Sequence, residues 1–506
     1  MQLTQCVHHA VQQTPDLAAT IFGDRVRTWA ESIDRVARLA AALAELGVRP
    51  GDRVGLLAPN SDIYHEFLLA VPWADAVLMP INTRWSASEI AFSLRDSDTH
   101  VLYVDEAFAP MVPQLRELAP CLRTVIEGEK AVDRLVAGHD PVPDARRGGD
   151  SLAGIFYTGG TTAEPKGVML SHNNMMLSAL GVVAATNAVP GGRYLHAAPM
   201  FHLAAIGGWM FHNVLGGTHV PLSPFTPVGM ADAIERHRVT DTLVVPTMLQ
   251  LLVDSPATAG HDLSSLRRLA YGASPISDAL LDRAAKRLPG TEFTQAYGMT
   301  ELAPVATLLG PEAHQVPRLR RSAGRAAPHV DVLIVDEHDV EVPRGDVGEI
   351  VARGDNVMLG YWNRPEETAH TLRGGWMHTG DAGYMDEDGY VFVVDRLKDM
   401  IVSGGENVYS AEVENALSKH PAVAACAVIG VPDGEWGERV HAVVVPVNGI
   451  QSTADELRDH VKQHIAGYKA PRTVEFVEEL PLSGAGKVLK RALRSRHWDG
   501  RDRSVS

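Results

Sequence analysis

The sequence predicts an α/β fold, in which a large N-terminal domain of helix-covered mixed sheets is followed by a smaller α+β domain. The chain has 506 residues, 45% of them hydrophobic, which is enough for more than one core. Helical and extended patterns alternate through its first third, as they do in sheets covered by helices. Beyond Thr371, short aromatic and β-branched strands separated by tight turns replace that alternation.

The first third begins with a helix whose start is marked by the capping-box pair Thr28 and Glu31. Apolar residues then recur at helical spacing from Ile33 to Leu43, until Gly47 ends the run. Next come predicted strands over 54–58, 76–81 and 101–104 and a helix over 63–70. The polar stretch 127–150 is predicted to be a loop or covering segment.

The C-terminal part has the pattern of a compact α+β unit. Strands are predicted over 390–395, 423–431, 440–447 and 473–476, and helices over 411–419, 453–465 and 490–496. The part beyond Lys398 is roughly one hundred residues long, which suits an independent domain.

Composition excludes several classes of protein. A net charge of −16 disfavours broad nucleic-acid binding, so any polyanionic ligand must be held by local cations. Three scattered cysteines, Cys6, Cys121 and Cys426, argue against a disulfide framework or a cysteine metal site. No long apolar run or signal-peptide pattern is recognised, and the expected location is the cytoplasm.

The segment 157–167, Y-T-G-G-T-T-A-E-P-K-G, combines the groups that hold phosphate. Glycines let backbone N–H groups approach an anion, threonines add hydroxyl donors and a lysine adds charge. These candidate ligands are Thr158, Gly159, Gly160, Thr161, Thr162 and Lys166. Pro165 and Gly167 flank the lysine, so the segment is not a Walker loop. A polar turn between buried elements is the alternative.

Four further motifs follow in a fixed order: 297–301 (Y-G-M-T-E), 379–381 (T-G-D), 395–399 (D-R-L-K-D) and 481–487 (P-L-S-G-A-G-K). Together with segment 157–167, the glycine loop, they resemble the motifs of the adenylate-forming superfamily of acyl-CoA synthetases, adenylation domains and luciferases. The resemblance covers nearly the whole chain, and 199–202 (P-M-F-H) and 403–407 (S-G-G-E-N) are most similar to the acyl- and aryl-CoA ligase branch. It implies an N-terminal domain over 1–397 and a mobile C-terminal domain over 398–506.

The resemblance implies an ATP-dependent, AMP-forming acid:CoA ligase, with ATP, Mg²⁺ and coenzyme A as cofactor and co-substrates. Thr158 and Glu301 would place Mg²⁺, a hard ion that prefers oxygen ligands. Thr161 and Lys166 would act on the phosphates. The remaining nucleotide-binding positions lie in two segments that resemble the adenine-site motifs: Gly272, Ala273, Ser274, Gln295, Ala296, Tyr297, Gly298, Met299 and Thr300. The alternative for Glu301 is a solvated loop acid, and for the segment that begins at Gly272 it is an ordinary loop turn.

Asp381 is predicted to accept hydrogen bonds from the ribose hydroxyls, since two carboxylate oxygens match a cis-diol. Arg396 would assist from the other side. The alternatives are that Asp381 is an ordinary turn residue and that Arg396 is one half of a surface ion pair.

The resemblance also assigns roles to residues of the C-terminal domain. Lys487 would bridge the carboxylate and the α-phosphate during adenylation, and Lys398 would be the hinge. Gly404 and Gly405 would border a tunnel for the coenzyme A thiol. For Lys487 the alternative is an ordinary exposed lysine, and for the two glycines it is a helix-entry turn.

The acid is expected to have an apolar tail, because residues 194–231 contain no Asp, Glu, Lys or Arg. An amino-acid substrate would need an acidic partner there. The predicted pocket residues are His202, Ile206, Trp209, Gly272 and Gly298, and ordinary core packing is the alternative. The expected acid is a medium- or long-chain fatty acid or an aryl acid, and the choice among these is left open.

Two residues of segment 157–167 differ from those that are usual in the family, and several other functions compete with the ligase. Gly159 stands where the family often has Ser, and Ala163 where Gly is usual. The alternatives are an adenylation enzyme that loads a carrier protein, a luciferase-like oxygenase, a P-loop kinase and an inactive nucleotide- or lipid-binding relative. No nucleic-acid partner or transmembrane segment is expected, and the oligomeric state is left open, with a homodimer among the alternatives.

Overall fold

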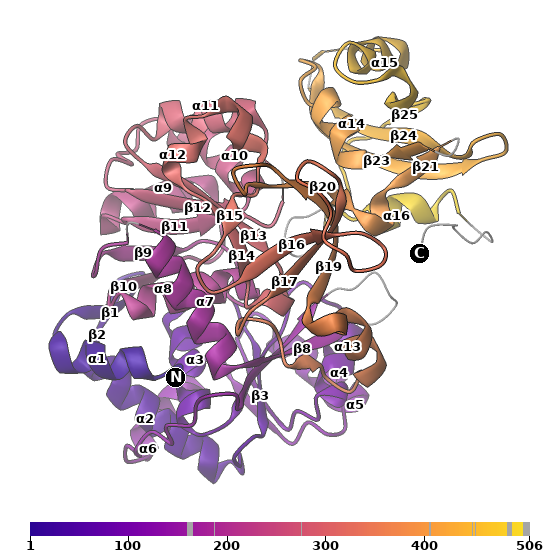
Figure 1. Ribbon diagram of the computed structural model, residues 1–506. Coiled ribbons are helices and arrows are strands. Elements are labelled where there is room, and N and C mark those ends of the chain that lie inside the picture. The colour runs from indigo at the N-terminus through magenta and orange to yellow at the C-terminus, as the bar shows by residue number, and fades with distance from the viewer. Residues whose placement is uncertain are drawn as a thin grey trace. The chain divides into compact units, whose positions relative to one another are not determined.

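The structure is a computed structural model that describes residues 1–158, 165–186, 188–274, 276–403, 406–447, 449–450, 452–482 and 488–498. The chain divides into two compact units (Figure 1). The first comprises Met1–Pro275, Leu280–Val332 and Ala352–Met377, and the second Ile276–Ala279, Leu333–Val351 and His378–Ser506. The predicted α/β class is confirmed, whereas a domain boundary at Lys398 stays a prediction.

A seven-stranded mixed sheet forms one half of the first unit. Its strand order is β18-β8-β7-β4-β3-β5-β6, with parallel pairing from β7 to β6 and antiparallel pairing at β8 and β18. The bounds are β3 (Arg53–Leu57), β4 (Val77–Pro80), β5 (Val101–Val104), β6 (Thr124–Glu127), β7 (Leu152–Thr158), β8 (Lys166–Ser171) and β18 (Gly360–Tyr361). The strands predicted over 54–58, 76–81 and 101–104 are therefore confirmed as β3, β4 and β5.

A nine-stranded sheet forms the other half, in the order β15-β14-β13-β12-β11-β9-β10-β1-β2. Its centre, from β13 to β1, is parallel, and both edges are antiparallel. The bounds are β1 (Ala18–Phe22), β2 (Arg25–Thr28), β9 (Arg193–His196), β10 (Thr218–Pro221), β11 (Asp241–Val244), β12 (Arg268–Gly272), β13 (Glu292–Gly298), β14 (Val305–Leu309) and β15 (Arg325–Ala326).

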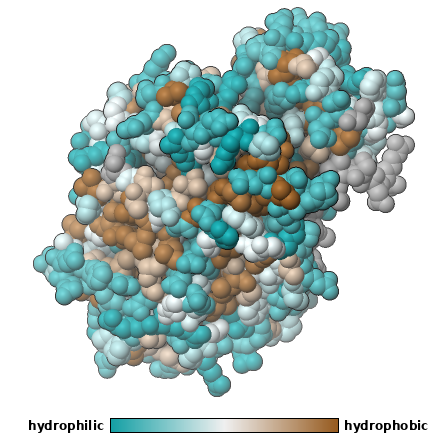
Figure 2. All heavy atoms as spheres, in the orientation of Figure 1, coloured by the Kyte–Doolittle hydropathy of each residue, from teal (hydrophilic) through white to brown (hydrophobic). Residues whose placement is uncertain are grey.

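Helices cover these sheets and pack between them. The helices up to residue 371 are α1 (Gln5–Gln13), α2 (Trp29–Glu45), α3 (Asp62–Trp73), α4 (Ala87–Asp96), α5 (Val112–Leu118), α6 (Gly128–Gly138), α7 (His172–Ala185), α8 (Leu203–Val214), α9 (Pro227–His237), α10 (Pro246–Asp254), α11 (Asp278–Arg287), α12 (Pro311–His314) and α13 (Pro365–Thr371). Short 3₁₀ turns are η1 (Ala109–Met111), η2 (Pro256–Thr258), η3 (Thr300–Leu302) and η4 (Pro317–Arg321). On the face shown in Figure 2, hydrophobic residues gather over α7 and α8.

Helix α3 belongs to the layer between the two sheets. It packs on β3 and β4 of one sheet and on β1 of the other, and all its residues are buried. Burial on every side requires its acids to be paired. Asp62 accepts from Arg25, with Nε 2.6 Å from Oδ2, and Arg35 Nε lies 2.6 Å from Glu66 Oε1.

The predicted start of α2 is confirmed, because Thr28 and Glu31 form both hydrogen bonds of a capping box. The prediction of a loop over 127–150 is wrong in part, since α6 occupies 128–138. Val132 and Val136 of this helix are buried against the main core, and Leu135 packs beside them. Val132 lies three residues before Leu135 and four before Val136, and this spacing is typical of one face of a helix.

Two smaller sheets form most of the second unit. One has the order β16-β17-β19-β20, with β16 (Asp331–Val335), β17 (Gly348–Arg353), β19 (Met377–Met385) and β20 (Val391–Arg396). The other has the order β22-β21-β24-β23, with β25 beside β24. Its bounds are β21 (Ile401–Ser403), β22 (Glu406–Val408), β23 (Val423–Asp433), β24 (Gly437–Pro446) and β25 (Thr473–Phe476).

Two hydrophobic cores stabilise the second of these sheets. Helices α14 (Ser410–Leu417) and α15 (Ala454–Lys462) contribute to one core, and α16 (Lys490–Ser495) contributes Leu493 to the other. The turns are η5 (Arg373–Gly375), η6 (Leu397–Asp399) and η7 (Gly467–Lys469). The predicted C-terminal elements are thus all present, within a few residues of their expected ends. No helix among the described residues is long and apolar enough to cross a membrane.

Candidate functional site

Most predicted nucleotide-site residues of the first unit lie at one edge of the nine-stranded sheet. Strands β9, β11, β12 and β13 are parallel, so their carboxyl ends meet at that edge. Gly272 ends β12, and Gln295, Ala296, Tyr297 and Gly298 end β13, followed by Met299 and by Thr300 in η3. Ligands of open α/β sheets bind outside the carboxyl ends of strands.

Close backbone packing explains the small residues at this edge. A Cβ on Gly272 would lie 2.4 Å from the Ala296 carbonyl oxygen, and one on Gly298 would lie 2.0 Å from that of Pro304. Ala273 has a φ of 68°, which is uncommon for a residue with a side chain. Such strain persists where surrounding structure enforces it, often beside a ligand site. Ser274 follows directly.

Glu301 is held by two elements that are distant in sequence. It lies in η3 and is only 6% exposed. The Tyr361 hydroxyl donates to its Oε1 at 2.9 Å, and the Met358 N–H donates to its carbonyl at 2.9 Å. Burial, and after it the Glu301 carboxylate, raises the pKa of Tyr361 above its ordinary value, so the phenol remains a donor. The backbone after Glu301 is fixed by buried Asn356, whose amide donates to the Leu302 carbonyl at 2.8 Å.

Lys166 begins β8, and the same tyrosine lies beside it. Strands β8 and β18 pair, with Tyr361 opposite Val168. The Lys166 ammonium lies 5.3 Å from the centre of the Tyr361 ring and forms an ion pair with Glu367 of α13. The ammonium lowers the pKa of Glu367 through a hydrogen bond. Glu301, Tyr361, Lys166 and Glu367 therefore form one connected polar chain.

Thr158 ends β7 directly opposite Lys166, and its hydroxyl lies 3.5 Å from the Lys166 carbonyl oxygen. The two ends of the glycine loop are therefore adjacent. Several predicted residues lie outside the described part of the chain, namely Gly159, Gly160, Thr161, Thr162, Gly404, Gly405 and Lys487, together with Ala163.

Of the predicted acyl-pocket residues, Gly272 and Gly298 end β12 and β13, and the other three follow the carboxyl end of β9. His202 lies at the N-cap position of α8 without a side-chain capping hydrogen bond, and the centre of its ring lies 4.3 Å from that of Phe201. Buried Asn60 holds the segment before it by donating to the carbonyls of His196 and Ala198 at 2.8 and 2.9 Å. Ile206 and Trp209 belong to the main core. The Trp209 indole donates to His65 Nδ1 at 2.9 Å.

In the second unit, Asp381 and Arg396 form one paired site. They are opposite residues of β19 and β20, and Arg396 Nε lies 2.7 Å from Asp381 Oδ1. Asp381 is 4% exposed, and its N–H donates to the Thr379 hydroxyl at 3.1 Å. Gly380 adopts φ 69° and donates its N–H to Glu349 at 3.0 Å. The sequence predicted both residues but not that each is the other's partner.

The segment around the predicted hinge is anchored to α16. Lys398 lies in η6, and the next residue, Asp399, accepts from Arg494 of α16 at 2.6 Å. Lys490, at the start of α16, lies 2.7 Å from Glu414 Oε1. Burial raises the pKa of Glu414, although Lys490 opposes the shift. Desolvation works to lower the pKa of Lys490, yet Glu414 and then Asp395 raise it above its ordinary value.

Sequence patterns did not indicate Tyr361, Glu367, Lys490 or Arg494. Tyr361 is 60 positions from Glu301, and Arg494 is 95 positions from Asp399. Only the folded chain brings these pairs together, so no local pattern could have identified them.

Known families and proteins match nearly the whole chain. Residues 7–362 match the family described as AMP-binding enzyme, and residues 412–487 match the AMP-binding enzyme C-terminal domain. The chain is 45% identical to a feruloyl-CoA synthase from Amycolatopsis sp over 486 residues, which cover 96% of this chain and 97% of the relative.

A second relative is the fatty acid–[acyl-carrier-protein] ligase ScoC of Streptomyces coeruleorubidus, 37% identical over 516 residues that cover 100% of this chain and 98% of the relative. Among solved structures, the amide bond synthetase McbA from Marinactinospora thermotolerans is similar, with a TM-score of 0.89 and 32% identity. That similarity covers 98% of this chain and 99% of McbA.

Proposed function

The chain belongs to the family of AMP-binding enzymes and is an adenylate-forming acid:CoA ligase; we propose that its acid carries an apolar aryl or fatty tail. The acid would first be activated as an acyl adenylate and then transferred to the thiol of coenzyme A. The observation that supports acid activation at this site is the buried hydrogen bond from Tyr361 to Glu301. Tyr361 lies on β18, which pairs with β8, the strand that begins at Lys166. This arrangement joins Lys166, the proposed phosphate ligand, to Glu301, the proposed metal ligand, through one tyrosine.

In the first half-reaction, a carboxylate oxygen of the acid attacks the α-phosphorus of ATP, and the bond to pyrophosphate breaks. Both reactants are anionic, so cations must neutralise the developing charge. Lys166 would bind the β- and γ-phosphates with the loop that begins at Thr158. To bind phosphate, the Lys166 ammonium must give up its ion pair with Glu367. The neighbouring Tyr361 ring would keep the ammonium in place.

The donor set suits Mg²⁺, because Glu301 offers a carboxylate and Thr158 a hydroxyl oxygen. When bound, the ion would neutralise phosphate charge. The Tyr361 hydroxyl would orient the carboxylate, and the Asn356 contact would hold the backbone behind it. The adenine would lie against Gly272 and Gly298, where close strand packing keeps side chains away.

The ribose would be bound by Asp381. Its carboxylate is buried and already ion-paired, so Arg396 fixes the orientation in which its oxygens accept from the two hydroxyls. The hydrogen bond from its own N–H to Thr379 fixes the backbone of the same residue.

Lys487 would supply charge to the α-phosphate during adenylation. In the second half-reaction, the coenzyme A sulfur attacks the acyl carbon, a C–S bond forms and AMP leaves with the electron pair of the C–O bond. Rotation of the backbone at Lys398 would separate the two half-reactions, with Gly404 and Gly405 beside the thiol path.

An apolar acid is supported by the segment 194–231, which lacks acidic and basic residues. Within it, His202 lies at the N-cap position of α8, and Ile206 and Trp209 of the same helix belong to the buried apolar core. The Amycolatopsis relative is named for feruloyl-CoA, so hydroxycinnamic acids are the first substrates to test.

The test is a panel of hydroxycinnamic, benzoic, medium- and long-chain fatty and amino acids, given with ATP, Mg²⁺ and coenzyme A. AMP, ADP and thioester are measured separately. We expect AMP and thioester in equal amounts with an aryl or fatty acid, and no ADP. Release of AMP only with amino acids would contradict the proposed acid class.

A second acceptor is favoured by the similarity to ScoC, which is named for transfer to an acyl carrier protein. The same assay with a phosphopantetheinylated carrier protein separates the two. An adenylate that reacts with the carrier protein at least ten times faster than with coenzyme A would assign the chain to carrier-protein loading.

A further inference from the structure

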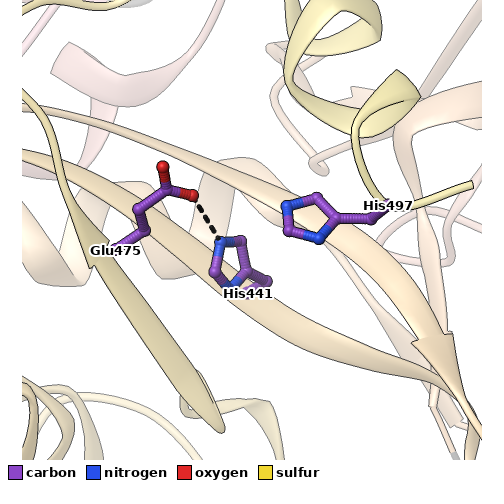
Figure 3. Close-up of side chains that lie close together, drawn as sticks. All are labelled: His441, Glu475 and His497. Atoms are coloured by element: carbon purple, nitrogen blue, oxygen red, sulfur yellow. Dashed lines mark ion pairs between the residues drawn. The ribbon is translucent and has the colours of Figure 1, made fainter.

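Three side chains far from the proposed nucleotide ligands converge on one face of the β21–β25 sheet. They are His441 on β24, Glu475 on β25 and His497, which follows α16 (Figure 3). One ligand atom from each lies within 4.8 Å of the other two. Strand β24 pairs with β25 in parallel, with His441 opposite Thr473, so Glu475 lies diagonally across from the imidazole on the same face.

His441 is oriented by a contact behind it. Its Nδ1 lies 2.7 Å from the Thr473 hydroxyl, while its buried Nε2 makes no hydrogen bond among the described residues and faces Glu475 in an ion-pair contact (Figure 3). When Nδ1–H donates to that hydroxyl, Nε2 keeps its lone pair. Metal-binding histidines are usually fixed through their second nitrogen in this way. The ring is well buried, with 8% of its side chain exposed.

The distance between His441 and Glu475 suits a small tetrahedral ion. His441 Nε2 lies 3.5 Å from Glu475 Oε2. Zinc bonds to nitrogen and oxygen are about 2.0–2.1 Å long, which places neighbouring tetrahedral ligands roughly 3.4 Å apart. The imidazoles of His441 and His497 have centres 5.0 Å apart and planes inclined at 59°, so they do not stack flat against each other.

The segment that carries His497 is fixed to the same sheet. The His497 N–H donates to the Arg494 carbonyl at 2.8 Å, and the neighbouring Trp498 indole donates to the Gly430 carbonyl of β23 at 3.0 Å. Arg439, a cation on the same strand as His441, is paired with Asp433 at 3.5 Å.

We propose that His441, Glu475 and His497 bind one divalent transition-metal ion of the zinc type. Two imidazoles and one carboxylate form a ligand set typical of zinc, with the fourth position left to water. The ion would join the end of α16 to β24 and β25. Because α16 begins three residues after Lys487 in the sequence, the ion would fix the far end of the helix that follows the proposed catalytic lysine. The site is independent of the proposed function, since it uses none of the same ligands.

The experiment uses the full chain without a polyhistidine tag, stripped of metal with a chelator and dialysed. Zinc is titrated by calorimetry, bound metal is counted after gel filtration, and cobalt absorption reports the coordination geometry. We expect one ion per chain with a tetrahedral cobalt spectrum. H497A removes one ligand and E475Q removes the ligand charge, so in each the affinity should fall by at least the roughly 10- to 100-fold that loss of an outer-shell partner costs. Both side chains are partly exposed, so these variants should fold normally, and thermal unfolding without metal checks this.

A second histidine group supplies the matched control. His420, His460 and His464 lie together, with ring centres 4.9 and 4.4 Å apart. H464A removes one exposed imidazole from that group and should leave zinc binding unchanged. Loss of the bound ion in H464A, with retention in H497A and E475Q, would overturn the assignment. So would the absence of a stoichiometric ion in the unmodified chain.

Discussion

Replacing Tyr361 with phenylalanine removes the hydroxyl that donates to buried Glu301 at 2.9 Å and leaves the ring beside Lys166. A hydrogen bond to a charged group contributes about 1.5–3 kcal/mol, and its loss leaves the carboxylate with one donor fewer in a buried site. Since about 1.4 kcal/mol is a factor of ten, acid activation should slow by about 10- to 150-fold. The Mg²⁺ concentration for half-maximal rate should rise, because a less oriented carboxylate is a poorer metal ligand.

The assay is acid-dependent exchange of labelled pyrophosphate into ATP, followed over a range of Mg²⁺ concentrations. The matched control is Tyr64→Phe in the same unit. Tyr64 is also fully buried, but its hydroxyl has no hydrogen-bond partner among the residues that the structure describes. Removing an unsatisfied hydroxyl costs little and can stabilise a protein, so this variant should exchange at the normal rate.

Two results would refute the reasoning. One is a Tyr361→Phe variant that exchanges within twofold of the unmodified chain at every Mg²⁺ concentration. The other is an equal loss in both tyrosine variants, which would assign the effect to packing. A lower unfolding temperature with unchanged exchange would show that the hydroxyl is structural only.

Three further predictions concern the C-terminal part. Lys487→Ala should slow pyrophosphate exchange at least about 10²-fold, the scale for losing one preorganised charge, and near-normal exchange would contradict its catalytic assignment. Lys398→Pro should leave adenylation intact and lower thioester formation, whereas equal loss of both would count against a hinge. Lys490→Met should lower the free energy of unfolding by up to about 3 kcal/mol, measured in urea. The pKa of Glu414 is already raised in the folded chain, and it rises further without the Lys490 ammonium. A carboxyl group whose pKa is raised by folding makes the folded state less stable as the pH rises through its titration. The loss of stability in the variant should therefore be larger at pH 8 than at pH 5.

Local signals predicted much of the fold. The Thr28–Glu31 capping box, the strand over 101–104 and the strand over 473–476 are present with the expected bounds, because each depends on neighbours in the sequence. The helix over 128–138 was missed, although Val132 and Val136 mark its buried side. Charged residues between apolar ones at this spacing are typical of an amphipathic surface helix, and the prediction of a loop gave weight to the polar composition and not to the spacing.

The candidate site was predicted through its motifs, residue by residue, but not through its contacts. Asp381 and Arg396 were both expected at the ribose, yet their 2.7 Å ion pair follows from the register of β19 and β20. Glu301 was expected as a metal ligand, while its hydroxyl donor comes from β18. Strand register is set by the whole sheet and by the core beneath it, which no short segment contains.

The sequence by itself determined the family, the chemistry of activation and the order of the motifs, because these depend on residue types at fixed local spacing. Tertiary structure alone decided which side chains support them. The chain from Glu301 through Tyr361 and Lys166 to Glu367, and the His441–Glu475–His497 group, join elements that are distant in sequence. Such contacts form only when sheets and helices pack, so their partners are fixed by burial and strand pairing and not by local composition.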